Sequence, residues 1–398
     1  MPDRWIRGPI GLDSERRVTR AGCRTVLVVI PAMAAGTRLR DLVSLLRSDH
    51  RVQCLFAVPD GHDAWAGTAE FAAARGGLVI PWHQAVNHRF DLVLAAGYTG
   101  LTEIHGRILV IPHGASSLMS RKYSRDAGPH GRPHTGLARE TLTSRGKLIP
   151  SALGLTHDDD LAALRKSCPE ALPVAVVAGD ICYDRLVVSA SLRDDYRRAL
   201  GVADDERLVT VSSTWSTASV FGRHPGLCRR LLTEAAGTPY RIALILHPNV
   251  WAVHGRGQVT AWMADCVDDG LLVIPPEEGW RATTVASDRV IGDYGSTTQY
   301  AAAIGKPVAL AAYPERAIRT RSLADRLAKV APRLDLSRSL LPQLERAEPH
   351  TRLTKFLTSR PGRSAAILRR TMYDLLELAE PAGEARLGAV PLPEPVAP

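Results

Sequence analysis

Three loops carry side chains that could bind phosphate or move a proton, and each follows directly on an apolar run. They are Ile111–Gly114 (IPHG), Ile245–Asn249 (ILHPN) and Gly292–Gln299 (GDYGSTTQ). Open parallel sheets bind their ligands beyond the carboxyl ends of the strands. If the apolar runs are such strands, the three loops are candidate binding loops.

His113 and His247 are the candidate catalytic residues. A neutral imidazole at a strand tip can accept a proton from a hydroxyl, so His113 is a candidate general base, and Gly114 lets the backbone turn sharply behind it. The alternative is a structural histidine that neighbouring groups satisfy. Proline fixes the backbone after His247, where the imidazole could donate a hydrogen bond to a phosphate oxygen.

The third loop is typical of a phosphate cradle. A short apolar run leads into a Gly-Ser-Thr-Thr turn and then a helix, so backbone N–H groups and the positive end of the helix dipole would face a ligand. A simple helix cap is the alternative, and the two roles are compatible. The loop has no Walker order, and neither half has a GxGxxG fingerprint. We expect a diphosphate to be held by His247, Asn249, Asp293, Gly295, Ser296, Thr297 and Thr298.

The elements that must position these loops alternate as in a doubly wound α/β fold. Short apolar runs rich in β-branched residues predict strands, and helix-period segments separate them. The expected strands are 25–30, 52–58, 78–80, 91–95, 108–111 and 174–178, then 208–212, 242–246, 271–274, 289–291 and 308–311. Helices are expected from about 37 and over 224–236, 257–267 and 297–304. Two Rossmann-like domains in tandem explain this pattern.

The chain has 398 residues, which is enough for two domains. We expect an N-terminal tail (1–20), an acceptor-side domain (21–191), a donor-nucleotide domain (192–314), a basic helical segment (315–380) and a flexible tail (381–398). The charged run Leu192–Glu206 marks the expected boundary. Ser116–Pro150 has loop composition, and its basic part, Arg121–Lys147, suggests a loop for an anionic acceptor.

Composition narrows the class of protein. Glu315–Arg370 holds 14 Lys/Arg against 5 Asp/Glu, which fits a contact with an anionic membrane or polymer, or a solvated helix face. Aromatic residues make up 5% of the chain and no nucleic-acid motif is present, so no nucleic-acid partner is expected. No apolar run is long enough to cross a bilayer, which favours a cytoplasmic protein, with peripheral contact at the inner membrane face as an option.

In their order, these motifs resemble the CDP-glycerol glycerophosphotransferase family, the teichoic-acid primases and polymerases of bacteria. The likeness rests on His113-Gly114, His247–Asn249 and the stretch SDRVIGDYGSTTQYAAAIGKPV, with VAGDICYDRL similar to the family's interdomain segment. It covers roughly 108–310. It implies a GT-B fold, in which two Rossmann-like domains face a central cleft, followed by C-terminal helices.

The resemblance also implies roles. His113 would deprotonate an acceptor hydroxyl, while His247 and the Ser/Thr turn hold the donor diphosphate as CMP leaves. Gly114, Arg121 and Lys122 are acceptor-side candidates. The acceptor would be a polyol, a lipid-linked molecule or a polymer. No tightly bound cofactor is expected, and Mg²⁺ can arrive with the donor diphosphate.

Two departures from the family keep other functions open. ASSLMSRKY follows Gly114 where the family has a Thr-Pro-Leu-Lys-like segment, and Gly295 replaces the first Ser of its DYSS turn. The HP element and Ser/Thr turn are also similar to those of CMP-sialic-acid-type transferases. The alternatives are a GT-B glycosyltransferase or epimerase-like enzyme using a UDP, dTDP or CMP sugar, and a catalytically silent nucleotide-binding scaffold.

Overall fold

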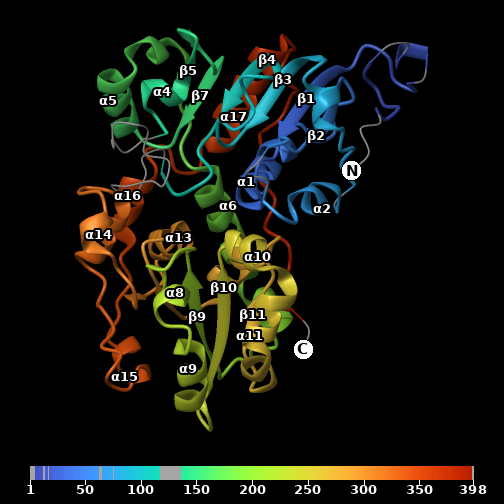
Figure 1. Cartoon of the computed structure of the whole chain (residues 1–398). Helices are drawn as coiled ribbons and strands as arrows, with labels where there is room; N and C mark the ends of the chain where they lie inside the picture. The colour runs from blue at the N-terminus through green and yellow to red at the C-terminus, as the bar shows by residue number, and fades with distance from the viewer. Residues whose placement is uncertain are drawn as a thin grey trace. The chain divides into compact units, whose positions relative to one another are not determined.

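The computed structural model describes residues 5–11, 14–16, 18–61, 65–74, 76–116 and 136–396. The chain divides into two compact units, each built on a parallel sheet (Figure 1). Unit 1 comprises Met1–His113, His134–Ile181 and Ser359–Leu387. Unit 2 comprises Gly114–Pro133, Cys182–Thr358 and Gly388–Pro398.

The sheet of unit 1 has six parallel strands in the order β2-β1-β3-β4-β7-β8. The strands are β1 (Arg24–Val29), β2 (Val52–Ala57), β3 (Arg89–Ala95), β4 (His105–Val110), β7 (Ala152–Leu155) and β8 (Ala175–Val177). The chain builds outward from β1 first to β2 and then to β3 on the other side. β1 and β3 therefore flank a topological switch point, the place where doubly wound sheets bind ligands.

Alternate residues of these strands pack against helices. Val26 and Val28 of β1 join Leu92 and Leu94 of β3 in one hydrophobic cluster. The helices α1 (Met33–Ser44) and α17 (Ser364–Leu376) contribute to the same cluster, although they lie more than 300 residues apart in the chain. Because alternate side chains of a strand point to the same face of the sheet, these strand residues pack together with the two helices in one apolar layer.

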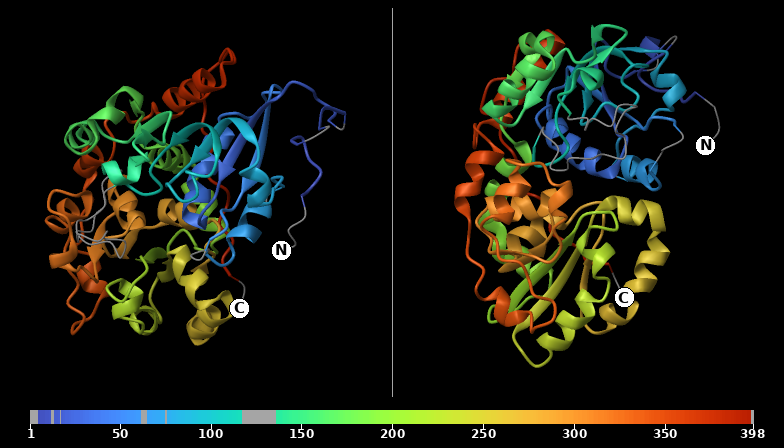
Figure 2. Two further views of the ribbon diagram at one scale, coloured as in Figure 1. Left: turned by 45° about the horizontal axis from the view of Figure 1, so that its top comes forward. Right: turned by 60° about the vertical axis from the view of Figure 1, so that its left-hand side comes forward.

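Unit 2 has a five-stranded parallel sheet in the order β11-β10-β9-β12-β13. The strands are β9 (Arg207–Ser213), β10 (Tyr240–Leu246), β11 (Leu272–Ile274), β12 (Arg289–Gly292) and β13 (Val308–Leu310). Helices cover both faces (Figure 2): α9 (Leu227–Ala235) and α11 (Arg256–Asp268) on one, α12 (Trp280–Ala286) and α13 (Ser296–Ala303) on the other. Both faces of the sheet are therefore covered, which explains why most of its strands are apolar runs; the central strand β9 also buries the polar residues Thr210 and Ser212.

Several elements differ from those expected. The first helix, α1, begins at Met33 instead of about 37. Leu78–Ile80 forms a single bridge, Phe56 to Val79, and no strand. β7 was not predicted, because its four residues, ALGL, follow directly on a stretch of loop composition. Within that stretch the structure has α4 (Arg139–Leu142) and a two-stranded sheet, β5 (Thr143–Ser144) with β6 (Lys147–Leu148).

The division between the units falls between Ile181 and Cys182, not between 191 and 192. It lies inside the VAGDICYDRL stretch, at the start of α6 (Ile181–Ser189). The charged helix α7 (Arg193–Ala199) belongs to unit 2 because it packs against α12. The basic segment 315–380 is likewise shared, since α14 (Leu323–Ala328) lies in unit 2 and α17 in unit 1.

The last residues of the chain also depart from the expected mobile tail. Val390 is 3% exposed, and its carbonyl accepts a hydrogen bond of 2.8 Å from the Tyr196 hydroxyl. Further on, the Val396 N–H donates to the Val273 carbonyl of the edge strand β11 at 2.8 Å. Residues 388–396 are thus anchored on unit 2. No helix in the described part of the chain is long and apolar enough to cross a membrane.

Candidate functional site

In unit 2 the candidate site lies where the central strand β9 has β10 on one side and β12 on the other. The chain adds β10 and β11 to one side of β9 and β12 and β13 to the other, so this is the switch point of the sheet. The loops that follow these three strands contain Thr214 and Trp215, His247, and Asp293–Ser296. Parallel strands bring all three loops to the same edge.

His247 follows β10 and caps the helix α10 (Pro248–His254). Its Nδ1 accepts a hydrogen bond of 3.1 Å from the Asn249 backbone N–H, so the hydrogen of the neutral imidazole is on Nε2. The Trp215 ring lies beside it, with 6.3 Å between ring centroids. His247 can therefore act as a donor at the sheet edge. The Asn249 side chain is buried, at 8% exposure, and its backbone makes the cap.

Asp293 holds the loops after β9 and β12 together. Its fully buried carboxylate accepts backbone hydrogen bonds from Thr214 (2.9 Å), Val220 (3.1 Å) and Gly295 (2.8 Å). Burial raises the pKa of Asp293 to about 6, although these N–H groups oppose the shift. With its oxygens bound by backbone N–H groups, this carboxylate positions the turn.

The turn itself depends on two glycines. A Cβ on Gly292 would lie 2.2 Å from the Thr298 hydroxyl, and one on Gly295 would lie 2.9 Å from the Asp293 carboxylate. Thr298 is fully buried and accepts a 3.3 Å hydrogen bond from the Asp293 N–H. Gly295 caps α13 without any side-chain bond, so the first N–H groups of that helix are not used by a capping side chain. Ser296 and Thr297, half-buried, begin the helix.

The segment after His113 approaches the same turn. The Ala115 N–H donates a 3.2 Å hydrogen bond to the Ser296 hydroxyl. A Cβ on Gly114 would lie 2.9 Å from that hydroxyl oxygen, so the close approach favours glycine. The sequence analysis placed Gly114 on the acceptor side. In the structure Gly114 lies against Ser296, one of the residues expected to bind the donor diphosphate.

His113 belongs to unit 1 and has the opposite tautomer. Its Nδ1 lies 3.2 Å from the Ala96 carbonyl, which can only accept, so Nδ1 carries the hydrogen and Nε2 the lone pair. His113 is an exposed residue, yet desolvation by the protein around the ring lowers its pKa, and the charge of Arg38 lowers it further. A neutral imidazole with a lone pair on Nε2 is the form a general base requires.

The expected site residues therefore fall into two groups. His247, Asn249, Asp293, Gly295, Ser296, Thr297, Thr298 and Gly114 gather at one edge of unit 2, and His113 lies in unit 1. Arg121 and Lys122 lie outside the described residues. The sequence analysis missed Thr214 and Trp215, which follow the predicted strand 208–212 but whose residue types do not by themselves indicate phosphate chemistry. Among the described residues, no group of three or more His, Cys, Asp or Glu is arranged to hold a metal ion.

Two Rossmann-like units, each with a doubly wound parallel sheet, define the GT-B fold, which is also the fold of known transferases and epimerases. A variant of the wall teichoic acid polymerase TagF is similar over 92% of this chain and 90% of that chain, with 13% identity and a TM-score of 0.57. UDP-GlcNAc 2-epimerase from Neisseria meningitidis bound to UDP-GlcNAc is similar over 89% of this chain and 99% of that chain, with 12% identity and a TM-score of 0.51. No family model and no curated protein matches the sequence.

Proposed function

We propose that the chain is a transferase that takes a nucleotide-diphosphate-activated donor, and that its reaction is that of a CDP-glycerol glycerophosphotransferase. The observation that carries the proposal is the pairing, at one sheet edge of unit 2, of an Nε2–H donor on His247 with the start of α13. A helix start attracts anions because its first N–H groups have no partner within the helix, and an N–H donor at the same sheet edge can add a directed bond.

On the donor side, Ser296 and Thr297 supply hydroxyls, and the first N–H groups of α13 supply backbone donors. Asp293 and Thr298 hold this turn and make no direct contact with the donor in our proposal. Asn249 acts through its backbone by fixing the His247 ring. If Mg²⁺ takes part, the donor phosphates bring it, as is common for this ion.

On the acceptor side, His113 is the proposed base. Its Nε2 takes the proton of an acceptor hydroxyl as the oxygen attacks the phosphorus that bears the polyol. The bond between that phosphorus and the bridging oxygen of the donor breaks, and CMP leaves with the electron pair. The Ala96 carbonyl holds the ring in the required tautomer throughout.

A second candidate is a glycosyltransferase or epimerase-like enzyme that uses a UDP, dTDP or CMP sugar. It is favoured by the fold shared with the UDP-GlcNAc 2-epimerase and by Gly295, which replaces the serine of the DYSS turn. A silent nucleotide-binding scaffold remains the third candidate. Peripheral contact with an anionic membrane stays a prediction, to be tested by sedimentation with anionic vesicles at low and high salt.

The test is a thermal-shift screen with CDP-glycerol, CDP-ribitol, CMP, UDP-sugars and dTDP-sugars, since a ligand that binds only the native state raises the melting temperature. We expect the cytidine nucleotides to give the largest shifts, and CMP release from CDP-glycerol when an acceptor is added. A shift confined to UDP- or dTDP-sugars would replace this proposal by the second candidate. Binding of the cytidine nucleotides without CMP release would favour the scaffold.

A further inference from the structure

The carboxyl edge of the unit 2 sheet carries positive charge that no neighbouring carboxylate balances. The segments that follow its five strands are residues 214–224, 247–256, 275–281, 293–296 and 311–322. They contain four arginines for which the described part of the chain provides no carboxylate partner, and these are Arg223, Arg316, Arg319 and Arg321. We call these four residues the edge arginines.

The carboxylates of the same segments already have partners. Three glutamates form ion pairs, and these pairs are Glu277 with Arg256, Glu278 with Arg281 and Glu315 with Arg333. Asp293 is buried and binds the backbone N–H groups described above. The positive charge of the edge arginines is therefore left over at this edge of the sheet.

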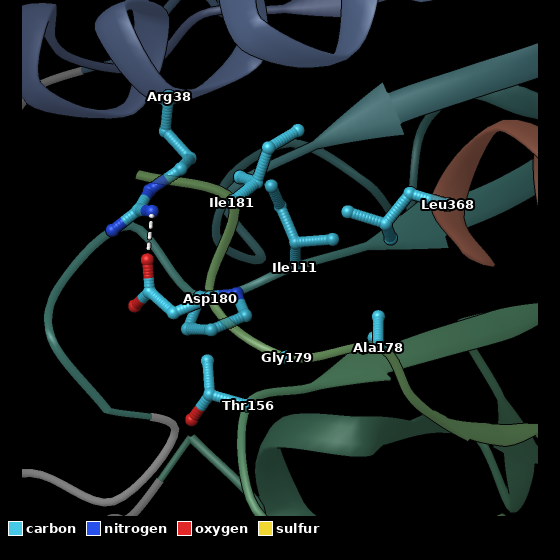
Figure 3. A pocket seen from close by; sticks show the side chains of 10 residues that line it. Arg38, Ile111, Thr156, Ala178, Gly179, Asp180, Ile181 and Leu368 are labelled. Carbon is cyan, nitrogen blue, oxygen red and sulfur yellow. Dashed lines mark hydrogen bonds and ion pairs between the residues drawn. The ribbon is translucent and has the colours of Figure 1, made fainter. Parts of the chain in front are cut away.

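A buried arginine of unit 1 shows the opposite case. Arg38 Nη1 lies 2.8 Å from Asp180 Oδ1, and the two side chains are 5% and 0% exposed. Figure 3 marks the contact between them. The charges of such a close pair largely cancel for an ion farther away, because the two Coulomb energies have opposite sign. An arginine without a carboxylate partner keeps its attraction over the screening length, which is about 10 Å at 0.1 M salt.

Three of the edge arginines belong to the segment that borders the turn proposed to hold the donor diphosphate. Ile318, between Arg316 and Arg319, is 2% exposed and packs in a small apolar cluster with Tyr294 of that turn. The segment leads into α14, which packs against α13, the helix whose start forms the proposed cradle. Arg316 and Arg321 are exposed and Arg319 is half-buried, so these side chains are at the rim of the turn.

The fourth edge arginine approaches the turn from the central strand. Arg223 is exposed and is the last residue of α8 (Val220–Arg223), the short helix after β9. The Val220 N–H donates a hydrogen bond of 3.1 Å to the Asp293 carboxylate, which also holds the turn. Segments that carry edge arginines therefore adjoin the turn from the strands on both sides of β12.

We propose that the edge arginines steer an anionic donor, a nucleotide diphosphate, toward the cradle and so raise its association rate. Charge of one sign beside a site raises the local concentration of an oppositely charged ligand and increases association rates by about 10- to 10³-fold. Charges at a rim act on the association rate, whereas buried charged ligands act on the dissociation rate. This inference rests on the proposed function, in which the cradle binds the donor diphosphate.

The experiment follows association of CDP-glycerol with the full chain by stopped-flow tryptophan fluorescence at several salt concentrations. The test variants are Arg316→Glu and Arg319→Glu, singly and combined. We expect the association rate constant at about 0.1 M salt to fall about threefold in each single variant and about tenfold in the double variant, the lower end of the steering range. The dissociation rate constant should stay as in wild type. The difference should vanish at about 1 M salt, where the screening length is about 3 Å.

Arg346→Glu is the matched control for the single variants. Arg346 is exposed and has no carboxylate partner among the described residues either. It lies at the amino end of the sheet, because the carbonyl of the next residue, Ala347, accepts a hydrogen bond of 3.1 Å from Arg289, the first residue of β12. β9 has seven residues at about 3.3 Å each, so the two ends of the sheet are roughly 20 Å apart, about twice the screening length. Arg346→Glu should therefore associate like wild type.

Two results would overturn the inference. One is association of the folded double variant and both single variants as fast as that of Arg346→Glu. The other is a raised dissociation rate constant with unchanged association, since the arginines would then be direct ligands. If wild type does not bind CDP-glycerol, the proposed function fails, and the same variants with inorganic pyrophosphate decide on steering. Pyrophosphate association that is absent or independent of salt would then overturn the inference as well.

Discussion

His247 has two tasks in the structure, and two substitutions separate them. Its Nδ1 caps α10 through the Asn249 N–H, and its Nε2 carries the hydrogen proposed for the donor diphosphate. His247→Ala removes both. His247→Asn keeps a side-chain oxygen that can cap the helix, since asparagine is among the best N-cap residues, but it places no donor at the position of Nε2.

The magnitudes follow from the bonds involved. Loss of an N-cap costs about 1 kcal/mol of folding free energy. Loss of a hydrogen bond to a charged phosphate costs about 1 to 3 kcal/mol of binding free energy, which is roughly 5- to 150-fold in Kd. We expect His247→Ala to show both losses. His247→Asn should keep the stability of wild type and show only the weaker binding.

Urea unfolding gives the stability, and isothermal titration with CDP-glycerol gives the affinity. The reasoning is refuted if folded His247→Asn binds the donor as tightly as wild type, because the imidazole would then serve only as a cap. Ser296→Ala combined with Thr297→Ala is a companion variant that should weaken binding without touching the cap of α10.

Three further predictions concern the base, the buried carboxylate and the chain end. His113→Ala should lower kcat by about 10²- to 10⁴-fold with little change in donor affinity, and wild-type turnover in this variant would place the base elsewhere. In wild type, the acidic limb of the pH profile should lie below the ordinary imidazole pKa of about 6.5. The reason is that desolvation and the charge of Arg38 both lower the pKa of His113. Asp293→Asn should weaken donor binding, because its amide group would turn an N–H toward backbone donors. The raised pKa of Asp293, about 6, stabilises the fold below the unfolded value of 3.8, and this contribution is lost as pH rises through 6. The unfolding free energy of wild type relative to Asp293→Asn should therefore fall between pH 4 and pH 7, and a constant difference would contradict the burial argument. Deleting residues 388–398 should lower the unfolding free energy by roughly 1.5–3 kcal/mol, the value for exposing one buried aliphatic side chain such as Val390, and an unchanged urea midpoint would mean that the tail contributes nothing.

The part of the candidate site that could be predicted from the sequence consists of residues that directly follow predicted strands. Apolar runs buried on both sides identify parallel strands, and in such sheets the next residue along is at the binding edge. His113, His247 and the Ser296 turn were found in this way. Thr214 and Trp215 follow a strand too, but their residue types do not by themselves indicate phosphate chemistry. Loop composition concealed β7, whose four residues are too short for a periodic signal.

The sequence alone therefore determined the fold class, because the alternation of apolar and helix-period segments is a local property of the chain. Only the tertiary structure decided what each polar side chain does. The tautomers of His113 and His247 depend on which backbone atom each Nδ1 meets, and the burial of Asp293 depends on the two loops, after β9 and β12, that converge on it. The anchoring of residues 388–396 and the pairing of Arg38 with Asp180 join segments far apart in sequence. Such contacts leave no periodic trace in the chain, since each depends on how distant elements pack.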